Sequence, residues 1–208
     1  MNSNTIQTDG HSLPIVEEFY TVQGEGHNTG RAAYFIRLAG CDVRCPWCDS
    51  KHSWNASCFA CHNVKDIAAR TKSAHAPHAV ITGGEPTMHH LGPLTSALHD
   101  LGIATWLETS GTHQLSGHFD WICLSPKRHM PPTDEACRNA DELKVIISTH
   151  DDFAWAEECA ARTTDTCLLY LQPEWDSTHD IMPDIVEYVK LHPQWRISLQ
   201  THKFMNIP

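Results

Sequence analysis

The stretch Ala79-Val-Ile-Thr-Gly-Gly-Glu-Pro86 sets a short apolar run directly before two glycines, a pattern typical of a buried strand that ends in a tight loop. Six other apolar runs accompany it, and because they are continuous rather than alternating, they predict strands buried on both faces. The seven predicted strands comprise residues 32–38, 79–82, 104–108, 121–124, 143–147, 168–171 and 195–199.

Helical patterns separate several of these strands. Leucines at positions 91, 94, 98 and 101 recur at helical spacing before Gly102, a residue type that commonly ends a helix. Residues 129–139 are predicted to form one irregular loop. The other predicted helices are one capped by Asn63 with Val64, Ile67 and Ala68 on its apolar side, one capped by Asp151 or Asp152 around Trp155 and Ala156, and one with Pro183 near its start and Ile185, Val186 and Val189 on one side.

The alternation of strands and helices predicts the fold class. Strand–helix–strand units give parallel strands joined by right-handed crossovers. A closed eight-stranded barrel usually needs about 250 residues, whereas this chain has 208, and its connection at residues 111–119 is short for a helix. We therefore predict an α/β fold with an open, abridged barrel of mostly parallel strands, in a single domain over residues 1–208.

Composition and charge exclude several classes of protein. Hydrophobic residues make up 41% of the chain and charged residues 19%, which is typical of a globular rather than a disordered protein. Lys and Arg number 15 against 25 Asp and Glu, so the net charge of −10 argues against a broad nucleic-acid surface. Because the sequence has no run of about 20 apolar residues and no signal sequence, we expect no membrane span and a cytoplasmic location.

Cys41, Cys45 and Cys48 form a CxxxCxxC motif that follows a predicted strand and a glycine. A loop of this kind can direct three thiolates at one centre, and a four-iron cluster held by three cysteines keeps one iron open for a small chelating molecule. A zinc site with Cys58 or Cys61 as fourth ligand is the alternative. The spacing favours the cluster, and the odd total of nine cysteines argues against a disulfide framework.

Three further motifs end predicted strands. In the Gly83-Gly-Glu-Pro86 motif the glycines allow the backbone to approach a ligand closely, and Glu85 offers an acceptor for a cationic amine. Glu108-Thr-Ser-Gly111 and Ser125-Pro-Lys127 end the next two strands. Because active sites of barrel folds lie at the carboxyl ends of the strands, we expect all these motifs around one site.

The order of these motifs resembles that of the radical S-adenosylmethionine (SAM) superfamily, in which an aromatic residue usually precedes the last cysteine, as Trp47 does here. The resemblance implies one [4Fe–4S] cluster on Cys41, Cys45 and Cys48. It also implies a bound SAM whose amino and carboxylate groups chelate the open iron, with the glycine loop near the amino group.

A narrower resemblance covers nearly the whole chain. Residues 18–26, 35–38, 48–54, 81–86, 125–127 and 200–203 are similar in order and spacing to segments of the 7-carboxy-7-deazaguanine synthase family. The resemblance implies a radical SAM lyase that converts 6-carboxy-5,6,7,8-tetrahydropterin to 7-carboxy-7-deazaguanine and ammonia, in the pathway to queuosine and related deazapurines. It further implies Mg²⁺, a homodimer and flavodoxin as electron donor. Since the cofactor radical carries the chemistry, no catalytic side chain is expected.

Site residues follow from this resemblance position by position. Ser50 stands where the family usually has a threonine whose hydroxyl binds Mg²⁺, and it keeps the oxygen ligand. Arg37 matches the residue that holds the substrate carboxylate, a task suited to a planar guanidinium. The other expected substrate contacts are Val22, Gln23, Gly24, Thr82, His202 and Pro208, and the expected SAM contacts are Gly84, Glu85, Thr109, Ser110, Ser125, Pro126 and Lys127.

Two rival interpretations stay open on the sequence. An activating enzyme that installs a glycyl radical on a partner protein would share the cysteine motif, but it would not explain Gln23, Arg37 and Pro208 together. A non-catalytic zinc module would combine the motif cysteines with Cys58 or Cys61. We predict instead that Cys58 and Cys61 are incidental thiols, and that the cysteines at positions 123, 137, 159 and 167 are core or near-core thiols.

Overall fold

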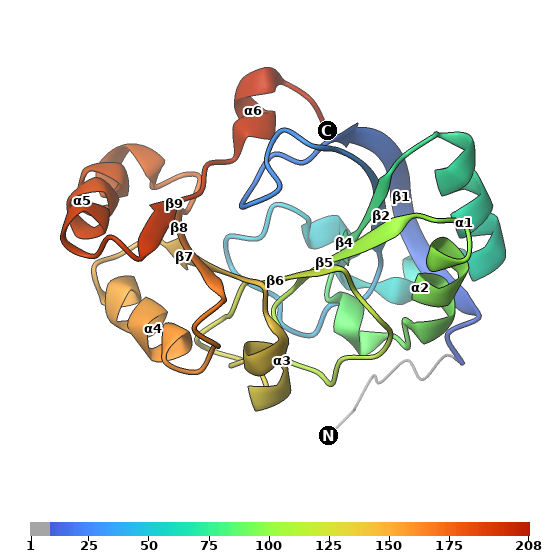
Figure 1. Ribbon diagram of the computed structural model, residues 1–208, viewed down its shortest axis with the longest axis horizontal. Helices are drawn as coiled ribbons and strands as arrows, with labels where there is room; N and C mark the ends of the chain where they lie inside the picture. The colour runs from blue at the N-terminus through green and yellow to red at the C-terminus, as the bar shows by residue number, and fades with distance from the viewer. Residues whose placement is uncertain (1–8) are drawn as a thin grey trace.

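A curved, nine-stranded sheet forms the centre of the computed structural model, which describes residues 9–208 (Figure 1). The strand order is β3-β1-β2-β4-β5-β6-β7-β8-β9, and β3 and β9 are its edges, so the sheet does not close. β1 (Ser12–Val22) is antiparallel to both β2 (Ala32–Leu38) and β3 (Cys61–Asn63). The remaining strands all pair in parallel, namely β4 (His78–Gly83), β5 (Ala104–Thr109), β6 (Trp121–Leu124), β7 (Glu142–Ile147), β8 (Leu168–Pro173) and β9 (Trp195–Ile197).

Helices cover the outer side of the curved sheet, and a short last helix lies across its open side (Figure 1). The arrangement confirms the predicted open α/β barrel of mostly parallel strands. None of the helices in residues 9–208 has the length and apolar character that crossing a membrane requires. The outer helices are α1 (Val64–Ser73), α2 (Gly92–His99), α3 (Asp134–Asn139), α4 (Asp151–Ala160) and α5 (Thr178–Leu191), the last helix is α6 (Thr201–Met205), and the 3-10 turns are η1 (Lys51–Trp54), η2 (Ala56–Cys58) and η3 (Pro86–Met88).

Two apolar cores lie between the sheet and its outer helices. Ile81 of β4 and Leu98 of α2 belong to one core, and Leu143 and Val145 of β7 belong to the other, all with no exposed surface. Side chains alternate along a strand, so Lys144, between these two residues of β7, faces the inside of the barrel and lines its cavity. β4, β5, β7 and β8 therefore each contribute one face to a core and residues of the other face to the cavity.

The inner face of the barrel changes from apolar to polar along the strands. Ala33, Val80 and Trp106 form a small apolar cluster on β2, β4 and β5. Two residues after Val80 comes Thr82, and two residues after Trp106 comes Glu108, and both line the cavity. The apolar cluster thus lies at the base of the barrel, and on β4 and β5 polar side chains line the space above it.

All seven predicted strands are present, with ends that differ from the prediction by at most two residues. The prediction missed β1 and β3. β1 carries Glu17 and Glu18, and much of its second half is exposed or half-buried, so it lacks the continuous apolar run of the parallel strands. An antiparallel strand with one solvated face gives this weaker pattern.

The first two predicted helices agree with the structure. The Asn63 side chain accepts a hydrogen bond from the backbone N–H of Lys65 at 2.9 Å, and it caps α1 as expected. In α2, Leu94 and Leu98 are fully buried, whereas Leu101 lies beyond the end of the helix and is exposed. The leucine stripe therefore overestimates the length of α2 by about one turn.

The predicted cap of α4 is wrong. His150 is the N-cap residue and its side chain makes no capping hydrogen bond. Asp152 lies inside the first turn, and its Oδ2 accepts from the backbone N–H groups of Ser148 (3.0 Å) and Thr149 (2.9 Å). The carboxylate thus fixes the turn that precedes the helix, an arrangement that a capping pattern does not distinguish from an N-cap.

Two further predictions need correction. α5 begins at Thr178, so Pro183 lies inside the helix rather than near its start, and Val186 is exposed rather than on the buried side. The predicted loop at residues 129–139 contains α3, because the Thr133 side chain accepts from the backbone N–H of Ala136 (3.1 Å) and caps the six-residue helix. A helix this short gives too few turns for an apolar period to be recognised.

We expect the substitution Leu98→Ala to lower the free energy of unfolding by about 3 kcal/mol, because it removes a fully buried side chain and leaves a cavity. Urea denaturation measures this loss. The matched control is Leu191→Ala in α5, whose side chain is 76% exposed, and it should change stability by less than about 0.5 kcal/mol. Equal effects of the two substitutions would contradict the assigned core.

Candidate active site

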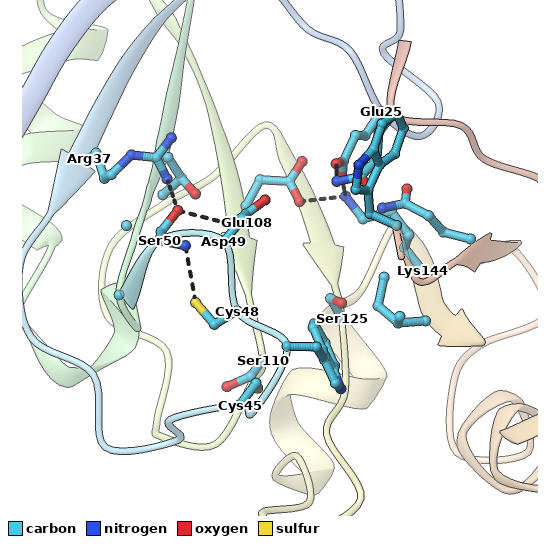
Figure 2. Close-up of a pocket in the computed structure, with 18 of the residues that line it drawn as sticks. Glu25, Arg37, Cys45, Cys48, Asp49, Ser50, Glu108, Ser110, Ser125 and Lys144 are labelled. Atoms are coloured by element: carbon cyan, nitrogen blue, oxygen red, sulfur yellow. Dashed lines mark hydrogen bonds and ion pairs between the residues drawn. The ribbon is translucent and has the colours of Figure 1, made fainter. Parts of the chain in front are cut away.

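A cavity of about 520 Å³ lies inside the open barrel, where the strands end in loops (Figure 2). The structure brings all the predicted site residues except Pro126 to this one cavity. Those that line it are Val22, Gln23, Gly24, Arg37, Cys41, Cys45, Cys48, Ser50, Thr82, Gly84, Glu85, Thr109, Ser110, Ser125, Lys127, His202 and Pro208. They come from segments spread over the whole chain, an arrangement expected of a site at the carboxyl ends of parallel strands.

The cysteine loop after β2 presents three thiols to the cavity. Cys41 and Cys45 are buried, Cys48 is half-buried, and all three are free. Burial raises the pKa of the Cys41 and Cys45 thiols, so an adjacent cation is needed to hold them as thiolates. The backbone N–H of Ser50 donates to the Cys48 Sγ at 3.3 Å and ties this thiol to the turn that follows it (Figure 2).

In residues 9–208 no three His, Cys, Asp or Glu side chains lie together in a way that could hold one metal ion, and this holds for the three motif cysteines as well as for the alternative zinc set. The two sets differ in where their cysteines lie. Cys58 and Cys61, the candidate fourth ligands, are exposed and do not line the cavity. The cysteines at positions 123, 137, 159 and 167 are buried, as predicted for core thiols.

The glycine loop after β4 packs directly on the cysteine loop. The Gly84 N–H donates to the Leu38 carbonyl at 2.9 Å, and the Glu85 N–H donates to the Gly40 carbonyl at 2.8 Å. A Cβ atom on Gly84 would lie 2.2 Å from the Gly40 oxygen and 2.9 Å from the Cys41 Cβ. Only glycine permits this approach, so the two loops form one surface.

The carboxylate of Glu85 joins the end of β4 to the end of β5. It is buried, and its Oε1 accepts from the Thr87 N–H (3.0 Å), the Thr87 hydroxyl (2.6 Å) and the Thr109 hydroxyl (2.5 Å). Its Oε2 accepts from the Ser110 N–H (2.8 Å) and hydroxyl (2.5 Å). A carboxylate has about four acceptor positions, so these bonds occupy the Glu85 side chain and position Thr109 and Ser110. Glu85 also lines the cavity, and its contact with SAM stays a prediction.

Arg37 and Ser50 form a polar group on one side of the cavity (Figure 2). The Arg37 Nε donates to Glu17 Oε1 at 2.6 Å, and its Nη1 donates to the Ser50 Oγ at 3.3 Å. The Ser50 hydroxyl in turn donates to Asp49 Oδ1 at 3.0 Å. A guanidinium, a hydroxyl and a carboxylate are thus held together beside the cysteine loop.

A second polar group, which sequence reasoning missed, lies around Lys144. Its Nζ donates to Glu25 Oε2 at 2.7 Å and to Glu108 Oε2 at 3.0 Å (Figure 2). Burial alone would lower the pKa of Lys144, but nearby anionic groups, including both carboxylates, raise it well above its ordinary value. Burial alone would raise the pKa of Glu25, but Lys144 and Gln200 lower it to about 2. A lone lysine within the apolar run of residues 143–147 was the available signal.

The C-terminal segment closes the cavity over the loop after β1. The Thr201 N–H and hydroxyl both donate to the Gly24 carbonyl at 2.9 Å, and the Gln200 Nε2 donates to Glu25 Oε1 at 2.9 Å. His202 lies against Gly24, where a Cβ atom would come within 2.4 Å of its Nδ1. Burial lowers the pKa of His202, which favours the neutral ring.

An open parallel barrel whose cysteine loop and glycine loop share one cavity has the architecture of a radical SAM enzyme. No protein-family model matches the chain. Over 96% of its length the chain is 48% identical to the 7-carboxy-7-deazaguanine synthase of Flavobacterium psychrophilum, 94% of which is covered. It is 46% identical to the protein of that name from Synechocystis over 94% of each chain.

Relatives from Escherichia coli agree in both sequence and structure. The 7-carboxy-7-deazaguanine synthase of E. coli K12 is 36% identical over 93% of this chain and 98% of its own. The crystal structure of QueE from E. coli superimposes with a TM-score of 0.79 and 34% identity, covering 96% of this chain and 99% of the other. The chain therefore belongs to the 7-carboxy-7-deazaguanine synthase family.

We expect Glu85→Gln to lower the free energy of unfolding by about 1–3 kcal/mol, because the new amide nitrogen cannot accept from the buried Thr and Ser donors. Urea denaturation of the variant and the wild type measures the difference. Glu158→Gln, on the exposed side of α4, is the control and should stay within about 0.5 kcal/mol of the wild type. If the Glu85 variant is as stable as this control, the carboxylate does not stabilise the junction between the ends of β4 and β5.

Proposed function

We propose that this chain converts 6-carboxy-5,6,7,8-tetrahydropterin to 7-carboxy-7-deazaguanine and ammonia, a lyase step in queuosine and 7-deazapurine biosynthesis. The observation that carries the proposal is the identity of 48% to a protein named for this product over 96% of the chain. The cavity supports it, because its polar groups suit a small ligand with a carboxylate and several N–H donors.

The cysteine loop suits a [4Fe–4S] cluster. Cys41, Cys45 and Cys48 surround one end of the cavity, and no fourth cysteine of the described residues lines it. This set leaves one iron without a protein ligand, as binding of SAM to the cluster requires. When bound, the cluster and SAM supply the radical chemistry. The chain binds the two small molecules, orients them and excludes water.

The ends of β4, β5 and β6 form the proposed SAM side. We assign the amino group of SAM to the backbone at Gly84, and its polar groups to Thr109, Ser110 and Ser125, all of which line the cavity. Lys127 Nζ donates to the Ser125 carbonyl and hydroxyl, both at 2.7 Å, and burial lowers its pKa. Pro126 does not line the cavity, so we limit its part to the shape of this turn.

The substrate carboxylate is assigned to Arg37. Two of its guanidinium nitrogens donate to Glu17 and Ser50, and the third, Nη2, has no hydrogen-bond partner among residues 9–208. A planar guanidinium with a free N–H is well suited to bind a carboxylate. The remaining proposed substrate contacts are Val22, Gln23, Gly24, Thr82, His202 and Pro208.

Ser50 is the proposed Mg²⁺ ligand. Its hydroxyl lies 3.0 Å from Asp49 Oδ1 and 3.3 Å from Arg37 Nη1, beside the position assigned to the substrate carboxylate. Hydroxyl, carboxylate and water oxygens are the ligands that Mg²⁺ prefers. The ion would neutralise and orient the substrate carboxylate.

The proposal extends to partners and location. The homodimer and the flavodoxin donor rest on the family resemblance. A cytoplasmic location fits the nine cysteines, all of which are free thiols, because such thiols persist in a reducing compartment.

One anaerobic assay tests the proposed function. The reconstituted protein is incubated with the tetrahydropterin, SAM and a reductant, and mass spectrometry follows the product. We expect brown, iron-containing protein and formation of the deazapurine carboxylate. A colourless protein holding one zinc ion and no iron, or one that cleaves SAM without consuming the pterin, would overturn the proposal.

Replacement of any motif cysteine should abolish turnover. Cys41→Ala, Cys45→Ala and Cys48→Ala each leave two thiolates, too few to hold the cluster, so iron content and product should both fall to background. Cys58→Ala and Cys61→Ala are matched controls on exposed thiols and should keep wild-type iron and activity. Loss of iron in either control would show that this pair takes part in the metal site.

Ser50→Ala should reduce turnover and its dependence on Mg²⁺, because it removes the hydroxyl ligand, while the iron content stays unchanged. Ser50→Thr keeps the oxygen and should remain active. Titration of Mg²⁺ into the assay measures the response of each variant. The same Mg²⁺ response in wild type and Ser50→Ala would remove the assignment.

A further inference from the structure

Lys144 is a buried ammonium group inside the open barrel, and the proposed cofactor and substrate contacts do not include it. Its side chain is 4% exposed and lies in the middle of β7, facing the cavity (Figure 2). Its Nζ donates to Glu25 at 2.7 Å and to Glu108 at 3.0 Å. One cation thus joins the loop after β1 to the end of β5.

The two carboxylates are more open to the cavity than the lysine between them. The side chains of Glu25 and Glu108 are 19% and 21% exposed, and both line the cavity. Glu25 Oε1 also accepts from Gln200 Nε2 (2.9 Å), and Glu108 Oε1 accepts from Gln23 Nε2 (3.1 Å). Because each carboxylate oxygen has about two acceptor positions, each acid keeps capacity for a further donor.

This group of charges is poorly explained as a device for stability alone. A buried ion pair commonly stabilises a fold no better than apolar side chains of the same volume. The inner face already has such side chains two residues earlier on β5, where Trp106 packs with Val80 and Ala33. The group also has one more acid than base, so its surplus negative charge favours a ligand that donates hydrogen bonds.

We propose that Lys144 is a positioning residue for the substrate, which holds Glu25 and Glu108 so that they accept hydrogen bonds from N–H groups of the reduced pterin. The inference rests on the proposed function. A tetrahydropterin has ring N–H groups and an amino group on the bicycle and a carboxylate at C6. Arg37 lies on the side of the cavity remote from Glu25 and Lys144 in the close-up (Figure 2), so the ligand carboxylate meets the guanidinium Nη2, which has no partner among the described residues, and its N–H groups meet the acids.

The test compares Lys144→Met with the wild-type holoenzyme. Methionine has a similar length and no charge, so the acids lose their shared donor. We expect KM for the pterin to rise about tenfold to hundredfold, because a factor of this size corresponds to the loss of one hydrogen bond to a charged group. Iron content and uncoupled SAM cleavage should stay at the wild-type level. The control is Lys190→Met, which removes an exposed lysine paired with Glu187, and it should leave every value unchanged.

The pH profile separates positioning from a structural role. Without Lys144, burial is left to raise the pKa of Glu25, so the variant should bind the pterin progressively more weakly from pH 8 to pH 6, beyond any change in the wild type. The other ionisable groups around Lys144 are Glu142, Cys123, His202 and Lys127, and they are present in both proteins. The comparison therefore isolates the effect of the lysine.

Glu108→Gln provides a second variant that keeps the volume and one acceptor, so it serves if Lys144→Met does not fold. It should also raise KM for the pterin with unchanged iron content. A wild-type protein that fails to turn over the pterin overturns the proposed function and this inference with it. If the wild type turns over the pterin, two results overturn this inference alone. One is an unchanged KM and pH profile in Lys144→Met, and the other is an unchanged KM in Glu108→Gln.

Discussion

The buried carboxylate of Glu85 joins the strand ends that form the cavity. It accepts five hydrogen bonds from Thr87, Thr109 and Ser110, and the backbone of the same loop bonds to the carbonyls of Leu38 and Gly40. β2, β4 and β5 thus end in a single bonded layer, and the cysteine loop rests on it. In a parallel sheet the loops carry the chemistry, and here their relative placement depends on one buried side chain.

An open barrel has to protect its interior where strands are missing. In this chain the loop after β1 and the C-terminal segment fill that side, and they are bonded to each other through Thr201 and Gly24 and to the sheet through Glu25 and Lys144. Hydrogen bonds in such a dry environment are strong, and a lost partner is costly. The closing segments are therefore held by polar contacts rather than by a second apolar core, which leaves the interior free for a polar ligand.

The sequence predicts what depends on local pattern and misses what depends on distant partners. The seven parallel strands carry continuous apolar runs, and the motifs at their ends are contiguous, so both can be read directly. β1 is solvated on one face, so it lacks a continuous apolar run, and α3 has only six residues, too few to show a helical repeat of apolar positions. The hydrogen bonds by which Glu85 joins the strand ends could not be predicted, because two of its partners lie 24 and 25 residues away. Lys144 lies within an apolar run, and the partner of its charge, Glu25, is 119 residues away and contacts it only in the folded chain.

The distribution of charge inside the cavity also determines how a ligand can enter it. Arg37 marks one side, and the acids Glu25 and Glu108, with one lysine between them, mark another. A molecule with a carboxylate at one end and N–H donors at the other pairs with both groups in one orientation. Turned around, its carboxylate meets the two acids and its N–H groups meet a guanidinium, and like charges in contact cost several kcal/mol. Under the proposed function, the arrangement of these few charges, rather than the net charge of the acidic chain, favours one orientation of the ligand.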